Sequence, residues 1–434
     1  MKTKILLASL LIVFGMTLTS RSYAQDSKTD ELQRQIDILG QEVQKLKTGP
    51  ASEPVADQRN YGFGPAASKV YRSQQGVTLG GYAELLMERF SSGFNKDGSI
   101  VPGKRHAPGA DFKASNGRAR VDILRAVLYA GYKFNDQWVM NSEFEWEHGG
   151  AEIAVEFLYL DYFWQKNINF RFGRMLMPVG LTNELHEPTV FLSTHRPTLE
   201  SLVIPTTWSE YGAGAFGDLG PFAYRSYVVT GFNGSGLEAG EGAREARNET
   251  GFANANNWLW TSRADYTATP GLLAGGSLTI GSASTAPAPG FDLISIPMKM
   301  LELHLQYDWH AFDFRAMGAY TVYSNIDQLN AQKAVGLSDS LGSKHGGFYA
   351  QVGYDLLSGS GQALIPFARW EVINTQLEVP PGYLKDRRNL IRELVAGVSY
   401  KPIPQIVFKG DYQWYLLGND DGVNQANLSL GYVF

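Results

Sequence analysis

The chain has 434 residues, no cysteine and a formal net charge of −5. Its length allows one large domain with an appendage. The lack of cysteine excludes a disulfide framework, a thiolate metal site and a lipid-anchored N-terminal cysteine. The negative charge argues against general binding to nucleic acid. Aromatic residues make up 12% of the chain, as in many-stranded proteins, whether a soluble sandwich or propeller or a membrane barrel.

Residues 1–24 have the layout of a signal peptide. Two lysines precede the apolar run 5–14, and a small-x-small cleavage site follows at 22–24. A membrane anchor is the alternative, but the run is shorter than the roughly 18 residues that a membrane-spanning helix needs. We expect the mature chain to start at Gln25. Cleavage takes the net charge from −5 to −8 because it removes three cations, Lys2, Lys4 and Arg21.

Residues 25–49 predict a short coiled-coil helix. The a and d positions of its heptads are apolar: Leu32, Ile36, Leu39, Val43 and Leu46. So short a coiled coil does not hold alone, and it needs something else to gather the chains, such as an oligomeric barrel. A lone amphipathic helix is the alternative. Residues 50–76, rich in Pro, Gly, Ala and Ser, predict a linker.

From Val77 to the C-terminus the hydrophobic period is 2, which predicts strands over 77–434. Leu303 and Leu305, for example, share one face of a strand, and Glu302 and His304 share the other. We place about sixteen antiparallel strands, with short links after the even-numbered ones and mostly long links after the odd-numbered ones. This sorting is typical of outer-membrane barrels, which have short periplasmic turns and long external loops, and not of soluble sandwiches.

The C-terminal strand is a second signal. Leu428, Leu430, Tyr432 and Phe434 alternate up to the last residue. A terminal apolar strand needs a partner, which a barrel supplies when this strand closes against the first one. The terminal Phe434 also resembles the signal read by the outer-membrane assembly machinery. We therefore predict an all-β fold, a transmembrane β-barrel of about sixteen strands in the outer membrane of a Gram-negative bacterium.

Several segments resemble a known family. They are Arg118–Tyr132, Phe134–Trp138, Asn141–His148, Phe170–Gly180, Asn183–Pro188 and Ile204–Phe216. The chain is similar to the phosphate-selective porin O and P family in its broad sense, best over residues 118–232 and diffusely up to residue 434. The resemblance implies a sixteen-stranded barrel, a homotrimer and passive diffusion of small solutes, and members of the family often carry a short N-terminal coiled coil.

The link 175–206 is the most informative loop. The third external loop of porins folds into the lumen and narrows it, because sixteen strands otherwise leave a wide aqueous hole. We expect the same of this loop, which four prolines would stiffen; a cap resting on the rim is the alternative. Its candidate constriction residues, with the one at its root, are Arg174, His186, Glu187, His195 and Arg196.

Further candidates lie on the polar faces of the predicted strands: Arg118, Arg120, Glu143, Glu145, Arg171, Arg263, Arg315, Arg369 and Lys409. Facing cations and carboxylates would create a transverse field that orients polar solutes. The alternative is that they merely keep the lumen hydrated. Phosphate-preferring members of the family have an arginine ladder, whereas the arginines here are scattered among abundant Glu. Anion or phosphate preference therefore stays open beside a general porin.

No cofactor, metal site or enzyme activity is predicted. The pair His186-Glu187 lacks a second His at helical spacing, and neither a nucleotide-binding loop nor a nucleophile elbow is found. The predicted function is passive diffusion of small hydrophilic solutes or ions, with the lipid bilayer and further copies of the chain as partners. The alternatives are a structural or adhesive outer-membrane barrel with a blocked lumen and a soluble secreted β-protein.

Overall fold

The structure is a computed structural model that describes residues 62–91, 105, 119–248, 253, 255–285, 292–419 and 421–434. These residues all belong to one of two units of the chain, Gln58–Phe434. The predicted signal peptide, coiled-coil helix and first part of the linker, as well as Arg118, lie outside the described residues. Among those that are described, no helix is long and apolar enough to cross a membrane.

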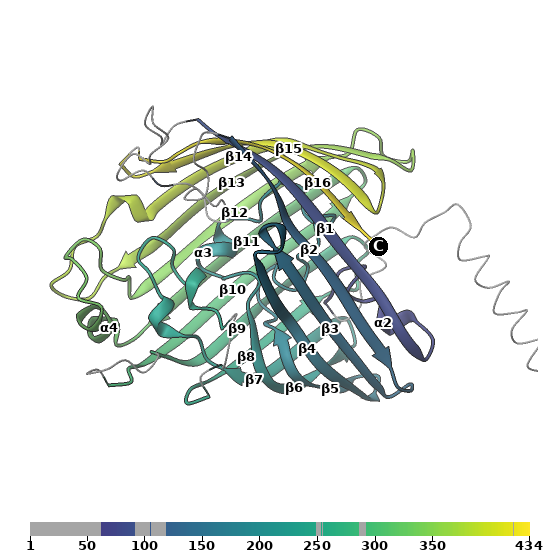
Figure 1. Ribbon diagram of the computed structural model, residues 1–434, viewed down its shortest axis with the longest axis horizontal. Coiled ribbons are helices and arrows are strands. Elements are labelled where there is room, and N and C mark those ends of the chain that lie inside the picture. The colour runs from purple at the N-terminus through teal and green to yellow at the C-terminus, as the bar shows by residue number, and fades with distance from the viewer. Residues whose placement is uncertain are drawn as a thin grey trace, which may run out of the picture. The chain divides into compact units, whose positions relative to one another are not determined.

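In the described part of the chain, sixteen antiparallel strands form a closed barrel (Figure 1). Each strand pairs with its neighbours in the chain, and β1 pairs with β16. The strands are β1 (Gly76–Phe90), β2 (Ala119–Lys133), β3 (Trp138–Glu147), β4 (Glu152–Gln165), β5 (Ile168–Leu176), β6 (Ser209–Leu219), β7 (Phe222–Thr230), β8 (Trp258–Tyr266), β9 (Leu272–Ser284), β10 (Ser295–Trp309), β11 (Phe312–Tyr323), β12 (Lys344–Tyr354), β13 (Ala363–Glu378), β14 (Leu390–Ile403), β15 (Ile406–Leu417) and β16 (Gln425–Val433). The predicted all-β, sixteen-stranded antiparallel barrel is confirmed.

The helices among the described residues are short. They are the α-helices α2 (Lys69–Arg72), α3 (Leu199–Leu202) and α4 (Ile326–Gln332), and the 3₁₀ turns η2 (His148–Gly150), η3 (Gly234–Gly236), η4 (Arg244–Ala246) and η5 (Arg387–Asn389). The links differ by end of the barrel, as expected. At one end tight turns join the strands, such as 310–311, where His310 has a positive φ of 54°. At the other end most links are long, with the short link 148–151 between β3 and β4 as an exception, and 177–208 is the longest of the fully described ones.

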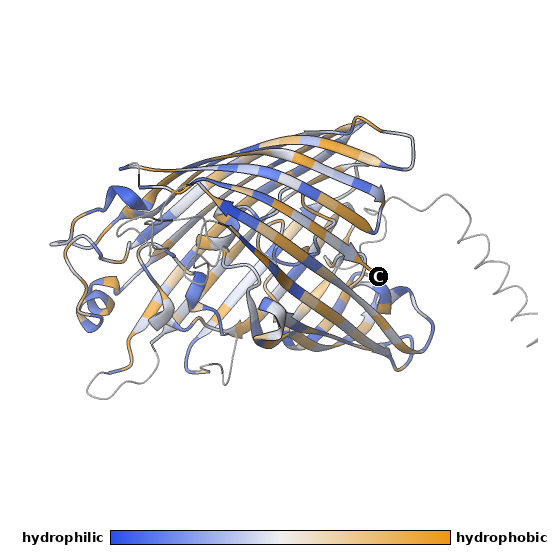
Figure 2. Ribbon diagram, turned by 45° about the horizontal axis from the view of Figure 1, so that its top comes forward, coloured by the Kyte–Doolittle hydropathy of each residue, from blue (hydrophilic) through white to orange (hydrophobic). Residues whose placement is uncertain are grey.

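The apolar faces of the strands point away from the barrel axis. Leu303 is 60% exposed, whereas its neighbours Glu302 and His304 are 0% and 5% exposed. Figure 2 shows this alternation of hydrophobic and hydrophilic residues along the strands. Phe314 lies in register with the exposed Val352, so it also faces outward. A barrel with an apolar outside and polar inward side chains matches the surroundings of a membrane-spanning barrel.

The N-terminal segment, which we define as residues 62–75, packs inside the barrel over residues 62–71, whereas Arg72, Gln74 and Gln75 are exposed. Phe63 and Val70 are 0% and 1% exposed, and the side chain of Asn141 on β3 donates to the backbone carbonyl of Ala67 at 2.9 Å. This differs from the linker predicted over 50–76. The small residues that suggest a linker here allow close contact with the barrel wall. A Cβ on Gly131 of β2, for example, would lie 2.5 Å from the side chain of Val70.

An apolar core occupies part of the barrel interior. The link between β5 and β6 contributes Met177, Val179, Leu202 and Trp208, and each of these is at most 1% exposed. They cluster with Phe63 and with inward-facing aromatic side chains of the wall, Tyr82, Tyr129, Phe157 and Tyr227. The interior is therefore not uniformly polar, because the segments inside it bring apolar side chains with them.

Candidate pore-lining site

The inner segment, defined as residues 177–208, leaves the wall after β5 and returns to it at β6. Its two ends are fastened to each other: the backbone N–H of Met177 donates to the carbonyl of Trp208 at 2.9 Å. The side chain of Asn183 joins the same residues, since its amide donates to the carbonyls of Met177 and Trp208 and its oxygen accepts from the N–H of Trp208. One buried amide thus closes the loop at its base.

The middle of the inner segment contacts the wall formed by β11–β15. The carboxylate of Asp411 accepts from the backbone N–H of Thr194 at 2.6 Å. The carboxylate of Glu371 accepts from the N–H groups of Thr198 and Leu199 at 3.1 and 2.9 Å. These acceptors are on β15 and β13, whereas the inner segment starts from β5. The segment therefore spans the interior of the barrel.

The predicted cations Lys409 and Arg315 also hold the inner segment. Lys409 donates to the carbonyl of Ser193 at 2.9 Å, and its ammonium lies 3.6 Å from the ring centre of Phe191. Arg315 donates to the carbonyl of Val190 at 2.7 Å and pairs with Asp313 on its own strand at 2.7 Å. Both cations donate to backbone carbonyl groups of the inner segment, and these buried carbonyl groups thereby gain hydrogen-bond partners.

His186 and Glu187 face the opposite wall. His186 lies 3.1 Å from a carboxylate oxygen of Glu143 on β3. Glu187 accepts hydrogen bonds from the backbone N–H groups of Ala66 and Ala67 in the N-terminal segment, at 3.0 and 2.9 Å. Burial raises the pKa of Glu187 to about 7, and the two backbone hydrogen bonds and His186 limit this rise. Within the described ranges, neither His186 nor Glu187 belongs to a group of three side chains that could hold a metal ion.

His195 pairs with Glu88 on β1, with 2.9 Å between the imidazole Nε2 and the carboxylate. Burial by itself lowers the pKa of His195, but its hydrogen bond to Glu88 and the nearby carboxylates raise that pKa above its ordinary value. Glu88 also accepts a short hydrogen bond from Arg120 on β2. His195, Glu88 and Arg120 thus form one connected charged group.

Most of the predicted wall cations have a carboxylate partner. Arg171 is fully buried, binds Asp161 with two hydrogen bonds of 2.8 and 2.9 Å, and lies over the ring of Tyr159 at 4.0 Å. Arg369 pairs with Glu371 at 2.6 Å, and Arg263 pairs with Asp265 at 2.8 Å. Each of the last two pairs joins residues i and i+2 on one strand face. In each of these pairs the carboxylate compensates the charge of the buried guanidinium group on the inner wall.

Arg174 and Glu145 are also among the predicted pore-lining residues. Arg174 donates to Ser209 at 3.0 Å and to the carbonyl of Asn248 at 2.9 Å, so it ties the root of the inner segment to the link after β7. Glu145 is 4% exposed and lies 4.0 Å from Arg125 on β2. Arg125 also lies 3.5 Å from Glu147.

A polar cavity of about 40 Å³ lies between the inner segment and β1–β2. It has room for water or a small ion. The lining residues are Glu84, Leu124, Arg125, Phe191, Thr194, His195, Arg196, Ser201 and Arg244. Within the described part of the chain, Arg196 Nη2 and Arg125 Nε are buried and have no hydrogen-bond partner. Burial and the charge of Arg125 lower the pKa of Arg196.

Arg125 and Arg244 in this cavity were not predicted. Strict alternation places Arg125 and Arg120 on opposite faces of β2, but the register shifts at Glu84/Leu85 and both side chains turn inward. A bulge of this kind leaves no reliable mark in a single sequence. Arg244 lies in the link after β7, on the 3₁₀ turn η4, and donates to the carbonyl of Thr206 in the inner segment.

The described residues contain no group of three or more His, Asp or Glu side chains that could hold a metal ion. The cavity around Arg196 does not resemble a metal site, because guanidinium groups outnumber carboxylates among the residues that line it.

Solved structures with the same fold are outer-membrane proteins. OmpT of Vibrio cholerae in a trimer form has a TM-score of 0.50 and 11% identity, covering 83% of this chain and 100% of that one. An anion-selective porin from Comamonas acidovorans has a TM-score of 0.51 and 11% identity, covering 83% and 100%. OprB of Pseudomonas putida at high pH has a TM-score of 0.50 and 12% identity, covering 83% and 94%.

No protein-family model matches the chain, so the resemblance to the phosphate-selective porin O and P family stays a prediction. A relative in Aquifex aeolicus (strain VF5), described as an uncharacterized protein, is 34% identical over 378 residues. The match covers 83% of this chain and 80% of the relative. The chain therefore belongs to the same protein family as this Aquifex aeolicus protein, and it has the fold of outer-membrane porins.

Proposed function

We propose that the protein is an outer-membrane porin of a Gram-negative bacterium through which small hydrophilic solutes or ions diffuse passively. The observation that carries this proposal is the direction of the strand faces. Apolar side chains such as Leu303 cover the outside of the barrel, and charged side chains such as Glu302, Arg369 and Lys409 face its interior. This distribution is typical of a barrel whose outside meets lipid and whose interior carries polar side chains, as in porins.

We further propose that the inner segment narrows the passage and that the cavity around Arg196 is its narrowest polar point. Three guanidinium groups, those of Arg125, Arg196 and Arg244, line this cavity against one carboxylate, Glu84, among its described lining residues. Fixed charges at a constriction set the ion preference of a channel. Glu145 and Glu147 compensate Arg125 from outside the lining. The proposed preference for anions, phosphate included, therefore rests on Arg196 and Arg244, although the chain as a whole is negative.

Planar-bilayer recording tests both statements separately. The purified protein is expected to give ohmic conductance steps; their absence would refute the porin function. In a KCl gradient the reversal potential should show anion preference, and Arg196→Gln should lower the anion-to-cation permeability ratio severalfold. Lys166→Gln, a matched loss of one cation in an exposed turn, should leave the ratio unchanged. An unchanged ratio in Arg196→Gln refutes the anion preference but not the porin.

A specific observation also favours the alternative, a structural or adhesive barrel with a blocked lumen. The apolar core and the N-terminal segment occupy the interior beside the inner segment, and Phe63, Met177 and Trp208 are each 0% exposed. If this filling closes the lumen, the external loops carry the function. A protein that gives no conductance but binds a partner at its surface would support this alternative.

Two further partners belong to the proposal. We propose a homotrimer, the form in which one OmpT neighbour is described, and recognition of the C-terminal strand by the assembly machinery. Phe434 directly follows this strand and exchanges backbone hydrogen bonds with Gly81 of β1, at 2.9 and 3.1 Å. The same residue that would serve as an assembly signal therefore closes the barrel.

A further inference from the structure

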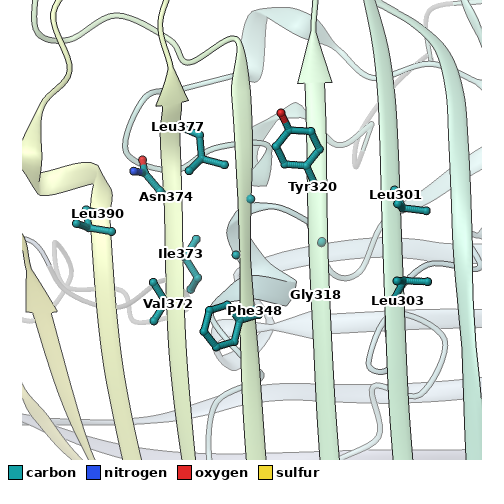
Figure 3. A pocket seen from close by; sticks show the side chains of 13 residues that line it. Leu301, Leu303, Gly318, Tyr320, Phe348, Val372, Ile373, Asn374, Leu377 and Leu390 are labelled. Carbon is teal, nitrogen blue, oxygen red and sulfur yellow. The ribbon is translucent and has the colours of Figure 1, made fainter.

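A groove crosses the outward face of the barrel over β10–β14 (Figure 3). Its volume is about 510 Å³, and its apolar lining includes Leu301, Leu303, Gly318, Tyr320, Phe348 and Val372. Gly318 lies in register between Leu303 on β10 and Phe348 on β12. Because glycine has no side chain, it leaves an opening between the large side chains of its two neighbours. A Cβ on Gly318 would meet no atom closer than 3.7 Å, which shows that the space above it is open.

Three cations border this groove on the same outward face. Lys299 precedes the lining residue Leu301 by two positions on β10, and Lys344 lies two positions before the lining residue Gly346 on β12. Arg392 on β14 is the register partner of the lining residue Val372. All three stand near the start of strands that follow long links, so they gather at the long-loop end of the barrel.

The charge around the groove is not balanced. Lys344 forms an ion pair with Glu378. Lys299 and Arg392 are both exposed, and among the residues that the structure describes neither has a hydrogen-bond or ion-pair partner. Cations on the lipid-facing side of a barrel are costly unless they meet water or an anionic group, and the cost falls toward the interface.

We propose that this groove binds a phosphate-bearing acyl lipid of the surrounding membrane. The acyl chain lies in the groove over Gly318, and the phosphate pairs with Lys299 and Lys344 on either side of β11. Arg392 borders the groove on the far side, on β14, and adds positive charge there without contacting the same phosphate. Lys299 and Lys344 flank β11 at roughly 10 Å, twice the spacing between strands, which leaves room for a head group between them. The surrounding hydrocarbon is as apolar as the groove, so filling the groove contributes packing. The preference for an anionic lipid therefore comes from the cations.

The charge also argues for lipid rather than a second copy of the chain. In a two-fold dimer formed through this face, Lys299 and Arg392 of one copy would approach those of the other, and like charges across an interface are unfavourable. An anionic head group instead supplies the compensating charge that the described residues lack.

Native mass spectrometry of the full chain in detergent, with phosphatidylglycerol or phosphatidylcholine added, tests the proposal. The wild type should retain phosphatidylglycerol in preference to phosphatidylcholine. Each basic residue near an anionic lipid contributes about fivefold to binding, so Lys299→Gln with Lys344→Gln should reduce this preference roughly 30-fold. The matched control is Arg89→Gln, which removes an exposed cation on β1 away from the groove, and it should behave like the wild type.

A second variant tests the groove itself. Gly318→Leu places a side chain in the open space above Gly318 and should lower the retention of both lipids without changing their ratio. Equal retention of the two lipids by the wild type overturns the proposal, as does a double variant that binds like the wild type or unchanged retention in Gly318→Leu. The chain has no native cysteine, so cross-linking of Phe348→Cys between two copies would show instead that a second copy covers the groove, and that also overturns the proposal.

Discussion

The carboxylate of Glu187 accepts hydrogen bonds from the backbone N–H groups of Ala66 and Ala67, 3.0 and 2.9 Å away. This contact joins the inner segment to the N-terminal segment, which are more than a hundred residues apart in the chain. Gly64 belongs to the same contact, because a Cβ there would lie 2.5 Å from the carboxyl group of Glu187. The two segments inside the barrel therefore depend on each other for their positions.

Glu187 should make the stability of the barrel depend on pH. Its pKa is raised to about 7 by burial, whereas in the unfolded chain it ionises near its ordinary value of 4.5. Between these two values the folded protein holds the extra proton, so the free energy of unfolding should fall as pH rises through this window, by at most roughly 3 kcal/mol. Denaturant unfolding in detergent from pH 4.5 to 8 measures this fall.

Glu187→Gln should flatten this pH dependence relative to the wild type, since the amide does not titrate. Asp136→Asn is the control, because that carboxylate is exposed in a turn and should leave the profile as it is. Parallel profiles for the wild type and Glu187→Gln would contradict the assignment.

The absence of a side chain at Gly131 should be needed for the N-terminal segment to pack against the barrel wall. Gly131→Ala places a Cβ against Val70, and overpacking of this kind costs typically 1–3 kcal/mol. The segment should detach more often, so trypsin should cleave faster after Lys69 and Arg72. Removal of the clashing atoms by Val70→Gly in the same chain should restore part of the protection.

Gly318→Ala is the matched control for Gly131→Ala. It adds the same methyl group at a wall glycine where the new Cβ has only ordinary contacts, so cleavage should keep its wild-type rate. Equal protection in all the variants would show that Val70 does not hold the segment.

Loss of Arg171 alone should lower the free energy of unfolding more than replacement of both Arg171 and Asp161 by apolar residues. Arg171→Met leaves Asp161 charged, buried and without its main partner, and the loss of one partner of a buried pair costs about 3–5 kcal/mol. The double variant Arg171→Met with Asp161→Leu removes both charges and should be clearly more stable than the single variant. Denaturant unfolding of the three proteins measures the difference. Equal losses in the single and double variants would contradict this account.

The N-terminal segment should restrict the lumen. If solutes cross the barrel, deletion of residues 62–75 opens space beside β2–β5 and should raise single-channel conductance by roughly a factor of two or more, because sixteen strands enclose a wide interior. Gly131→Ala should raise it less and intermittently, as the segment detaches. Conductance equal to that of the full chain would show that solutes take a path that the segment does not border.

The barrel wall could be predicted from the sequence because its signals are local. The alternation along 301–309, the short links after even strands and the terminal Phe434 each follow from residues close together in the chain. Departures from alternation could not be predicted in the same way. The register shift at Glu84/Leu85 turns both Arg120 and Arg125 inward, and it depends on how two strands pair.

The amino-acid sequence by itself therefore determined the number, direction and outward face of the strands, since a period of 2 needs nothing but neighbouring residues. Only the tertiary structure decided what fills the barrel. Residues 62–75 have the composition of a linker, yet Gly131 and Glu187, distant in the chain, hold them inside. Likewise, the cavity around Arg196 exists because β1, β2, the inner segment and η4 meet there. Contacts between residues so far apart in the chain arise only when the barrel closes.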